Sequence, residues 1–130
     1  MPDRDVISTE HAPAAVGAYS QAIRAGDLVF TAGQLGIDPA TGEFSAPDVS
    51  GQAEQALANL AAILEAADSG LDRLVKVTVF LADIGDWPAL NDVYARVIPA
   101  PYPARSAFAV KDLPKGGRVE IEAVAMARAG

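Results

Sequence analysis

Residues 119–126 read Val-Glu-Ile-Glu-Ala-Val-Ala-Met, and this stretch decides the fold predicted for the chain. Side chains alternate across a strand, so every second residue from Val119 faces one way, whereas Glu120 and Glu122 face the other. The face with the two glutamates also carries apolar side chains, those of Val124 and Met126. A face of this mixed kind is not expected to stay open to water. Covering it with copies of the same chain in a cyclic oligomer is the simplest solution.

A long helix is expected before this strand, from a cap at Asp48 or Ser50 to about Ala67. Its apolar residues recur at three- and four-residue spacing, which is typical of a single buried stripe. Gly70 follows the end, where a left-handed residue is wanted. The polar residues between the apolar ones are expected to face water: Gln52, Gln55, Asn59 and Glu65.

A second helix is expected from Asp86 to Ile98, because Pro88 in its first turn loses no hydrogen bond there. The predicted strands cover residues 6–8, 18–24, 28–32, 74–82, 105–110 and 118–127. This order indicates an α+β fold in which two helices lie on one face of a mixed sheet. Since no linker or repeat divides the chain, residues 1–130 are expected to form a single domain.

The amino-acid composition argues against several classes of function. The 130 residues are 51% hydrophobic and carry a net charge of −7, which argues against non-specific binding to nucleic acid or to anionic membranes. The chain has no cysteine and one histidine, His11, so neither a thiol nucleophile nor a zinc site is expected. No phosphate-binding or dinucleotide-binding motif is present, so no metal or cofactor is expected. The N-terminus does not resemble a targeting signal, and a cytoplasmic location is the expectation.

Arg105 and Glu120 are the candidates for chemistry, and each has a plain alternative. Arg105 follows Tyr102-Pro-Ala at the start of a strand, where rigid apolar flanks favour bidentate capture of a carboxylate over an ordinary surface position. Glu120 is either a solvent-facing strand residue or, in a cleft between subunits, a carboxyl group whose pKa moves toward neutrality. For Glu122 we expect an ion pair with Arg118 or with a cation of a neighbouring subunit.

Other polar residues favour structural readings when they are taken alone. Tyr19 is expected to be a core tyrosine, Asn91 an exposed helix residue and His11 a loop residue. Gly33 ends a strand, which permits either a turn or close approach of the backbone to a ligand.

Several blocks of the sequence, taken together, resemble the RidA/YjgF family of imine and enamine deaminases, some members of which are labelled endoribonuclease L-PSP. The blocks are Ala12-Pro-Ala-Ala-Val-Gly-Ala-Tyr-Ser-Gln-Ala, Phe30-Thr-Ala-Gly-Gln, Val75-Lys-Val-Thr-Val-Phe-Leu, and Pro103-Ala-Arg-Ser through Leu113 to Val119-Glu-Ile-Glu-Ala. This resemblance covers almost the whole chain. It implies a chorismate-mutase-like fold and a homotrimer with active sites in the clefts between subunits.

The resemblance also implies an activity: cofactor-free hydrolysis of 2-aminoacrylate or 2-iminopropanoate to a 2-keto acid and ammonia, which removes a reactive intermediate. Arg105 would hold the substrate carboxylate and Glu120 would activate the water. The implied contacts to substrate come from Tyr19 of the adjacent subunit, Asn91, and the backbone near Gly33 and Ala107. Where many relatives have serine and cysteine, this chain has Ala32 and Ala107, each with backbone donors still available.

Two other functions stay open. A non-catalytic trimer could bind small carboxylates or act as a chaperone, and it would need Arg105 but not Glu120. An endoribonuclease is disfavoured by the acidic charge and by the shortage of histidine.

Overall fold

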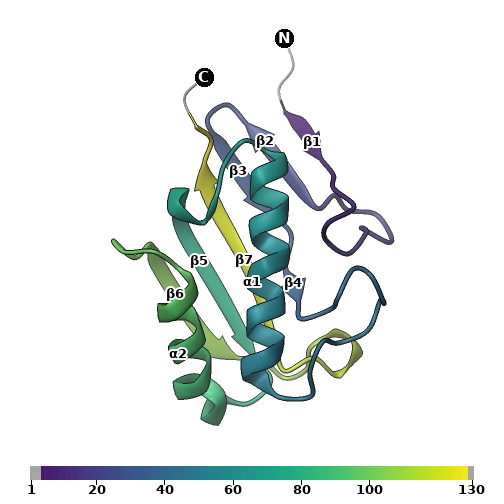
Figure 1. The fold of residues 1–130 in the computed structure, drawn as a ribbon, viewed down its shortest axis with the longest axis vertical. Helices are drawn as coiled ribbons and strands as arrows, with labels where there is room; N and C mark the ends of the chain where they lie inside the picture. The colour runs from purple at the N-terminus through teal and green to yellow at the C-terminus, as the bar shows by residue number, and fades with distance from the viewer. Residues whose placement is uncertain (1–3, 129–130) are drawn as a thin grey trace.

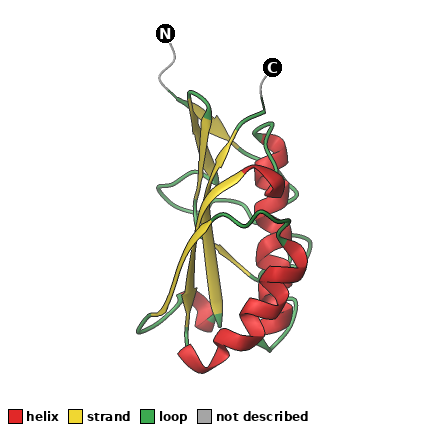
Figure 2. Cartoon of the chain, turned by 90° about the vertical axis from the view of Figure 1, so that its left-hand side faces the viewer, coloured by secondary structure: helices red, strands yellow, loops and turns green. Residues whose placement is uncertain are grey.

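The strands form one sheet, and both helices cover the same face of it (Figure 1 and Figure 2). The computed structural model describes residues 4–128. The strands are β1 Asp5–Ile7, β2 Ala22–Ala25, β3 Leu28–Thr31, β4 Gln34–Leu35, β5 Leu74–Leu81, β6 Ala104–Ala109 and β7 Val119–Met126. The helices are α1 Val49–Ala66 and α2 Trp87–Val97, and short 3-10 turns cover Leu71–Arg73, Ile84–Asp86 and Pro114–Gly116.

The sheet is mixed, as the sequence predicts. The strand order is β1-β2-β3-β7-β5-β6, and β4 pairs with β7 beyond the end of β3. Only the β5–β6 pair is parallel among the strands of residues 4–128, and α2 is the crossover that connects these two strands. The α+β architecture with two helices on one sheet face is therefore confirmed.

The last strand alternates as the sequence predicts. Val119, Ile121 and Ala125 are fully buried, whereas Glu122 and Met126 on the opposite face are exposed. The buried set packs under α1, together with the inward residues of β5 and the apolar stripe of α2. This packing fixes which way Glu120 points, because a strand cannot turn one side chain over without turning its neighbours.

Two polar residues of α1 contradict the prediction that they face water, because Gln52 and Asn59 are buried. Gln52 donates to the carbonyl of Ala46 at 3.0 Å and accepts from the backbone N–H of Arg118 at 2.8 Å. Asn59 donates to the carbonyl of Ile37 at 2.9 Å. Both amides therefore satisfy loop backbone that the helix covers, which helical periodicity alone cannot reveal.

The helix end also differs from the prediction. The left-handed residue after α1 is Asp68, with φ 58°, a conformation that aspartate tolerates better than most residues. Gly70 is extended, with φ −180°. A Cβ added at Gly70 would meet only the ends of the exposed Arg128 and Asp72 side chains, which can move aside, so neither backbone conformation nor space requires a glycine here.

The sheet face opposite the helices is left uncovered within one chain, as Figure 2 shows. Phe30 is 44% exposed and Phe108 is 45% exposed on this face. Phe80 and Phe108 meet edge to face, with ring centres 5.4 Å apart. Exposed aromatic side chains grouped in this way are typical of a surface that another protein copy covers.

None of the helices between residues 4 and 128 combines the length and the apolar character needed to cross a membrane.

Candidate active site

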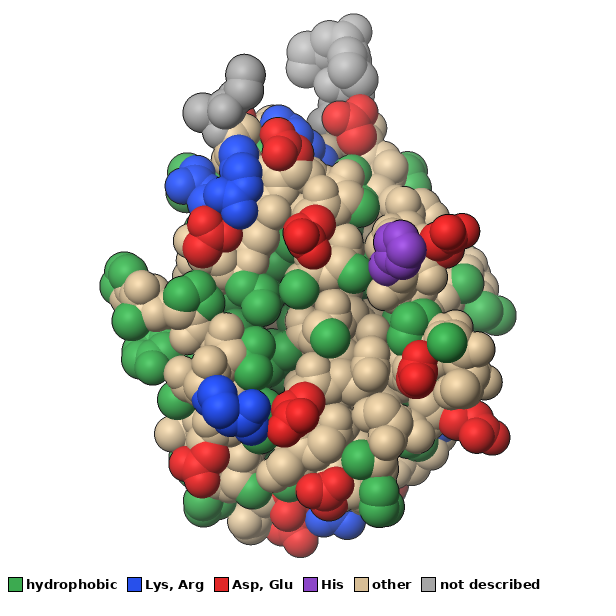
Figure 3. All heavy atoms as spheres, viewed as in Figure 1, with side chains coloured by type: hydrophobic (Ala, Val, Ile, Leu, Met, Phe, Trp, Pro, Cys, Tyr) green, Lys and Arg blue, Asp and Glu red, His purple; other side chains and the backbone are tan. Residues whose placement is uncertain are grey.

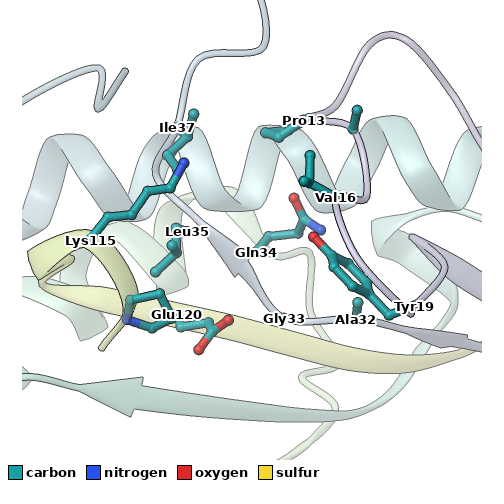
Figure 4. Close-up of a pocket in the computed structure, with 12 residues that line it drawn as sticks. Pro13, Val16, Tyr19, Ala32, Gly33, Gln34, Leu35, Ile37, Lys115 and Glu120 are labelled. Carbon is teal, nitrogen blue, oxygen red and sulfur yellow. The ribbon is translucent and has the colours of Figure 1, made fainter. Parts of the chain in front are cut away.

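Glu120 lies at the edge of a hollow of about 640 Å³ beside the start of β7. Figure 4 shows its carboxylate turned toward Gly33, with Tyr19 above and Lys115 on the other side of the hollow. The N-terminal loop, the β3–β4 junction and the turn before β7 all contribute to the wall. Its lining consists of Pro13, Ala14, Val16, Tyr19, Ala32, Gly33, Gln34, Leu35, Ile37, Pro114, Lys115 and Glu120. A carboxyl group in such a largely apolar hollow is suited to proton transfer.

The surroundings of Glu120 favour its protonated form. Burial raises the pKa of the Glu120 carboxyl, and the nearby charge of Glu122 raises it further. Gly33 packs directly against this side chain, since a Cβ added there would lie 2.5 Å from Oε2 of Glu120. The absence of a side chain at Gly33 therefore leaves room for Glu120, and close approach of this backbone to a ligand stays a prediction.

A buried amide holds the loop that forms one wall of this hollow. Gln21 donates to the carbonyls of Thr9, Ala12 and Pro13 at 3.0, 3.3 and 2.7 Å, and its Oε1 accepts from the N–H of Thr9 at 2.7 Å. The predicted strand over residues 18–24 therefore starts only at Ala22. The side chain of Gln21 supplies the hydrogen-bond partners of loop backbone groups that lie outside the sheet.

The backbone between β3 and β4 is bonded across the break in the ladder. The hydroxyl of Thr31 accepts from the N–H of Ala123 at 3.0 Å, a place that a strand carbonyl would otherwise take. The N–H of Ala32 donates to the carbonyl of Gln21 at 2.9 Å. The expectation that Ala32 offers a free backbone donor is therefore wrong.

Arg105 lies in a second, smaller hollow of about 230 Å³, formed by α2 and the start of β6. Its Nη1 donates to Oδ1 of Asn91 at 2.9 Å. Its guanidinium carbon lies 4.5 Å from the ring centre of Trp87 and 4.6 Å from that of Tyr94. Tyr102 and Pro103 complete the lining. Asn91 is thus a half-buried partner of Arg105, and the prediction that it is a plain exposed residue is wrong.

The two hollows share no lining residue. Arg105 pairs in register with Val77, a core residue, and points toward α2. Glu120 pairs with Phe80 and points to the face that no helix covers. One chain therefore does not bring Arg105 and Glu120 together. Any site that uses both must be shared between copies.

Of the remaining predicted residues, Tyr19 lines one of these hollows, whereas Ala107 and His11 line neither. Tyr19 is 54% exposed at the rim of the Glu120 hollow, so the prediction of a core tyrosine is wrong. Ala107 packs against the main core, two residues beyond Arg105 on the same side of β6. His11 is an exposed loop residue, as expected.

The predicted pairing of Glu122 with Arg118 is also wrong. Arg118 instead pairs with Asp86 at 2.7 Å, which ties the start of β7 to the start of α2. In the part of the chain that the structure describes, Glu122 has no ion-pair partner.

Trp87, Tyr94 and Gln21 are site residues that the sequence did not single out. Trp87, Asn91 and Tyr94 follow four- and three-residue spacing on α2, the one signal that could have grouped them around Arg105. Between residues 4 and 128, no group of three or more histidine, cysteine, aspartate or glutamate side chains is placed to hold a metal ion.

Residues 9–127 match the family described as Endoribonuclease L-PSP. The chain belongs to the RidA/YjgF family. It is 58% identical to a RutC family protein of Sinorhizobium fredii over 91% of this chain and 94% of that protein. It is 50% identical to a protein of the goat, Capra hircus, named 2-iminobutanoate/2-iminopropanoate deaminase, over 95% of this chain and 90% of the relative.

Solved structures give the same family. The crystal structure of RidA from an Antarctic Psychrobacter superposes with a TM-score of 0.91 at 48% identity. It covers 94% of this chain and 98% of the Psychrobacter chain. The resemblance to the RidA/YjgF family that the sequence blocks indicate is therefore confirmed.

Proposed function

We propose that this protein hydrolyses small enamine and imine acids of the 2-aminoacrylate and 2-iminopropanoate type to a 2-keto acid and ammonia. The observation that carries the proposal is the pair of half-sites. One offers a guanidinium fixed by Asn91, and the other a carboxyl group whose pKa is raised. The names of the relatives support the same reaction class.

The proposed site forms between subunits of a homotrimer with the fold of chorismate mutase. Arg105 of one chain binds the substrate carboxylate, and Asn91 and the backbone near Ala107 lie beside it. Glu120 of the adjacent chain orients the water, with Tyr19 and the backbone near Gly33 completing the pocket. The exposed aromatic side chains of the uncovered sheet face support an assembly of this kind.

The chemistry needs few groups. The imine carbon is already electrophilic, so a bound water adds to it once Glu120 accepts a proton from that water. The nitrogen of the resulting tetrahedral adduct is then protonated and leaves as ammonia, and the carbon keeps the oxygen as a ketone. Hydrolysis changes no oxidation state, so positioning and proton transfer are sufficient. A carboxyl group can accept a proton in one step and return it in the next, and a raised pKa makes Glu120 a better proton acceptor than an ordinary glutamate.

A coupled assay tests the reaction. A serine or cysteine dehydratase generates 2-aminoacrylate, and the loss of imine absorbance is followed with wild type and with Arg105→Ala. We expect wild type to accelerate the loss and the variant not to do so. If intact wild-type oligomer binds pyruvate but leaves the rate unchanged, the protein is a carboxylate-binding or chaperone-like trimer instead.

The charge of the chain makes RNA cleavage the less favoured activity. Its net charge is −7. Figure 3 shows acidic side chains scattered over the helix-bearing side, and basic ones only in small groups. Among the basic side chains, Arg96 is paired with Glu54 and Arg128 with Asp72. Phosphate backbones are bound by extended basic surfaces. If the purified protein cleaves RNA and does not hydrolyse imines, RNA cleavage becomes the favoured activity.

A further inference from the structure

The guanidinium of Arg105 is enclosed by two aromatic side chains of α2. Trp87 and Tyr94 are seven residues apart on one stripe of the helix, roughly 10 Å along its axis at about 1.5 Å per residue. The guanidinium carbon is 4.5 Å from one ring centre and 4.6 Å from the other. Both rings therefore contact the guanidinium, and Asn91 lies between Trp87 and Tyr94 on the same stripe.

This enclosure leaves one edge of the guanidinium for a ligand. Nη1 is engaged by Oδ1 of Asn91. Within residues 4–128, Nε and Nη2 have no hydrogen-bond acceptor. An arginine side chain presents two parallel N–H donors along such an edge, which match the two oxygens of a carboxylate. The hollow in which this guanidinium lies is completed by Tyr102 and Pro103.

We infer that Trp87 and Tyr94 are positioning residues, which hold the Arg105 guanidinium between their rings so that its free edge meets the substrate carboxylate in plane. This inference rests on the proposed function. Cation–π attraction to two rings limits the rotation of a long side chain before substrate arrives, so less conformational freedom is lost on binding. The rings also exclude water from the guanidinium, which strengthens its bond to a carboxylate.

Tyr94 acts through its ring and not through its hydroxyl. The hydroxyl is buried and has no hydrogen-bond partner in the described part of the chain, and burial raises the pKa of this phenol, opposed by the charge of Arg105. Tyr94→Phe is accordingly the conservative variant, because it keeps the ring face and removes only an unpaired polar atom. Trp87→Phe is its counterpart on the other side of Arg105.

The test is pyruvate binding by isothermal titration calorimetry with wild type, Trp87→Leu, Trp87→Phe and Arg105→Ala. We expect Trp87→Leu to weaken binding by about tenfold and Trp87→Phe to recover most of that loss. In the deaminase assay, Trp87→Leu should raise KM by a similar factor at nearly constant kcat. A purely structural role would instead lower the melting temperature and leave KM unchanged. Wild-type affinity in Trp87→Leu overturns the inference.

Trp87 is the one tryptophan in the chain, so its emission gives a second readout that needs no Trp87 variant. Pyruvate should change the emission of wild type with the calorimetric Kd, and should not change that of Arg105→Ala. Calorimetric binding without any emission change also overturns the inference. If Arg105→Ala binds pyruvate as well as wild type does, the carboxylate anchor of the proposed function fails too. If Arg105→Ala loses binding while Trp87→Leu binds like wild type, the inference fails but the carboxylate anchor of the proposed function stands.

Discussion

Arg105 and Glu120 point to opposite sides of one sheet. Arg105 extends from the edge strand β6 toward α2, while Glu120 extends from β7 into the hollow beneath the N-terminal loop. Arg105 is held by a hydrogen bond to Asn91 and by contact with two aromatic rings. The pKa of Glu120 is raised by burial, and the absence of a side chain at Gly33 leaves room for its carboxylate. Their separation within one chain means that the proposed reaction depends on assembly.

Substitution should separate binding from rate. Arg105→Ala removes a charge-assisted bidentate contact and is expected to weaken pyruvate binding about a hundredfold. Glu120→Gln should keep the affinity within a fewfold and lower kcat at least about a hundredfold, because only proton transfer is lost. Arg96→Ala is the matched control, since the exposed Arg96–Glu54 ion pair touches neither hollow and should leave both quantities unchanged. Equal loss of affinity in both site variants would contradict these roles.

The pH dependence should follow the carboxyl group of Glu120. Since the ionised form accepts the proton from water, kcat/KM should rise with pH through the raised pKa of Glu120. Glu122→Gln removes one of the two causes of that raised pKa, so the rising limb should move to lower pH. The limb should vanish in Glu120→Gln. If the rising limb stays at the same pH in Glu122→Gln, it reports the titration of a group other than Glu120.

Stability should show the same titration with a defined sign. Because the folded state binds the Glu120 proton more tightly than the unfolded state does, ionising this group lowers the free energy of unfolding. Relative to Glu120→Gln, wild type should lose stability as pH rises from the ordinary glutamate pKa through the raised value. Below that window the two proteins should differ by a constant amount. Urea titrations at several pH values measure the difference.

Two glycines should respond differently to alanine. The Cβ of Gly33→Ala meets only the flexible end of Glu120, so folding should change by less than about 1 kcal/mol while kcat falls about a hundredfold. The Cβ of Gly36→Ala meets the backbone of Gln52 in α1, which cannot move aside, and should cost about 2 kcal/mol of stability. Urea unfolding and the deaminase assay measure both quantities. Wild-type kcat in Gly33→Ala would contradict the packing of Gly33 against Glu120.

Gln21 should be a structural support of the Glu120 hollow. Gln21→Leu leaves the backbone of Thr9, Ala12 and Pro13 without its partner and should cost about 3 kcal/mol of stability. Hydrogen exchange at Thr9 should speed up, because its N–H is bonded only to this side chain in the described structure. The backbone N–H of Ala123 donates to the hydroxyl of Thr31, so its exchange should stay slow and serves as the internal reference.

The sheet and its helices follow from local sequence patterns. Alternation from Val119 to Met126 fixes both faces of β7, and the apolar spacing of the two helices places them on one of those faces. The errors concern polar residues with distant partners. Gln52 and Asn59 are buried because loop backbone far along the chain needs their amides, and no pattern within α1 contains that information.

The candidate site was predicted residue by residue, but not in its arrangement. Glu120, Gly33 and Tyr19 do lie around one hollow, and Arg105 and Asn91 do form another. That Arg105 faces α2 depends on the parallel register of β6 with β5, which is set by the α2 crossover and not by the residues beside Arg105. For the same reason the sequence did not single out Trp87 and Tyr94 as neighbours of Arg105.

A mixing experiment tests most directly whether the active site is shared between chains. Arg105→Ala and Glu120→Gln are each expected to be inactive alone, and co-expression lets them assemble together. In a cyclic trimer with random 1:1 mixing, about a quarter of the sites should pair an intact Arg105 with an intact Glu120 from the adjacent chain. We therefore expect about a quarter of wild-type activity. Inactive mixtures, in trimers shown by mass spectrometry to contain both chains, would contradict a shared site.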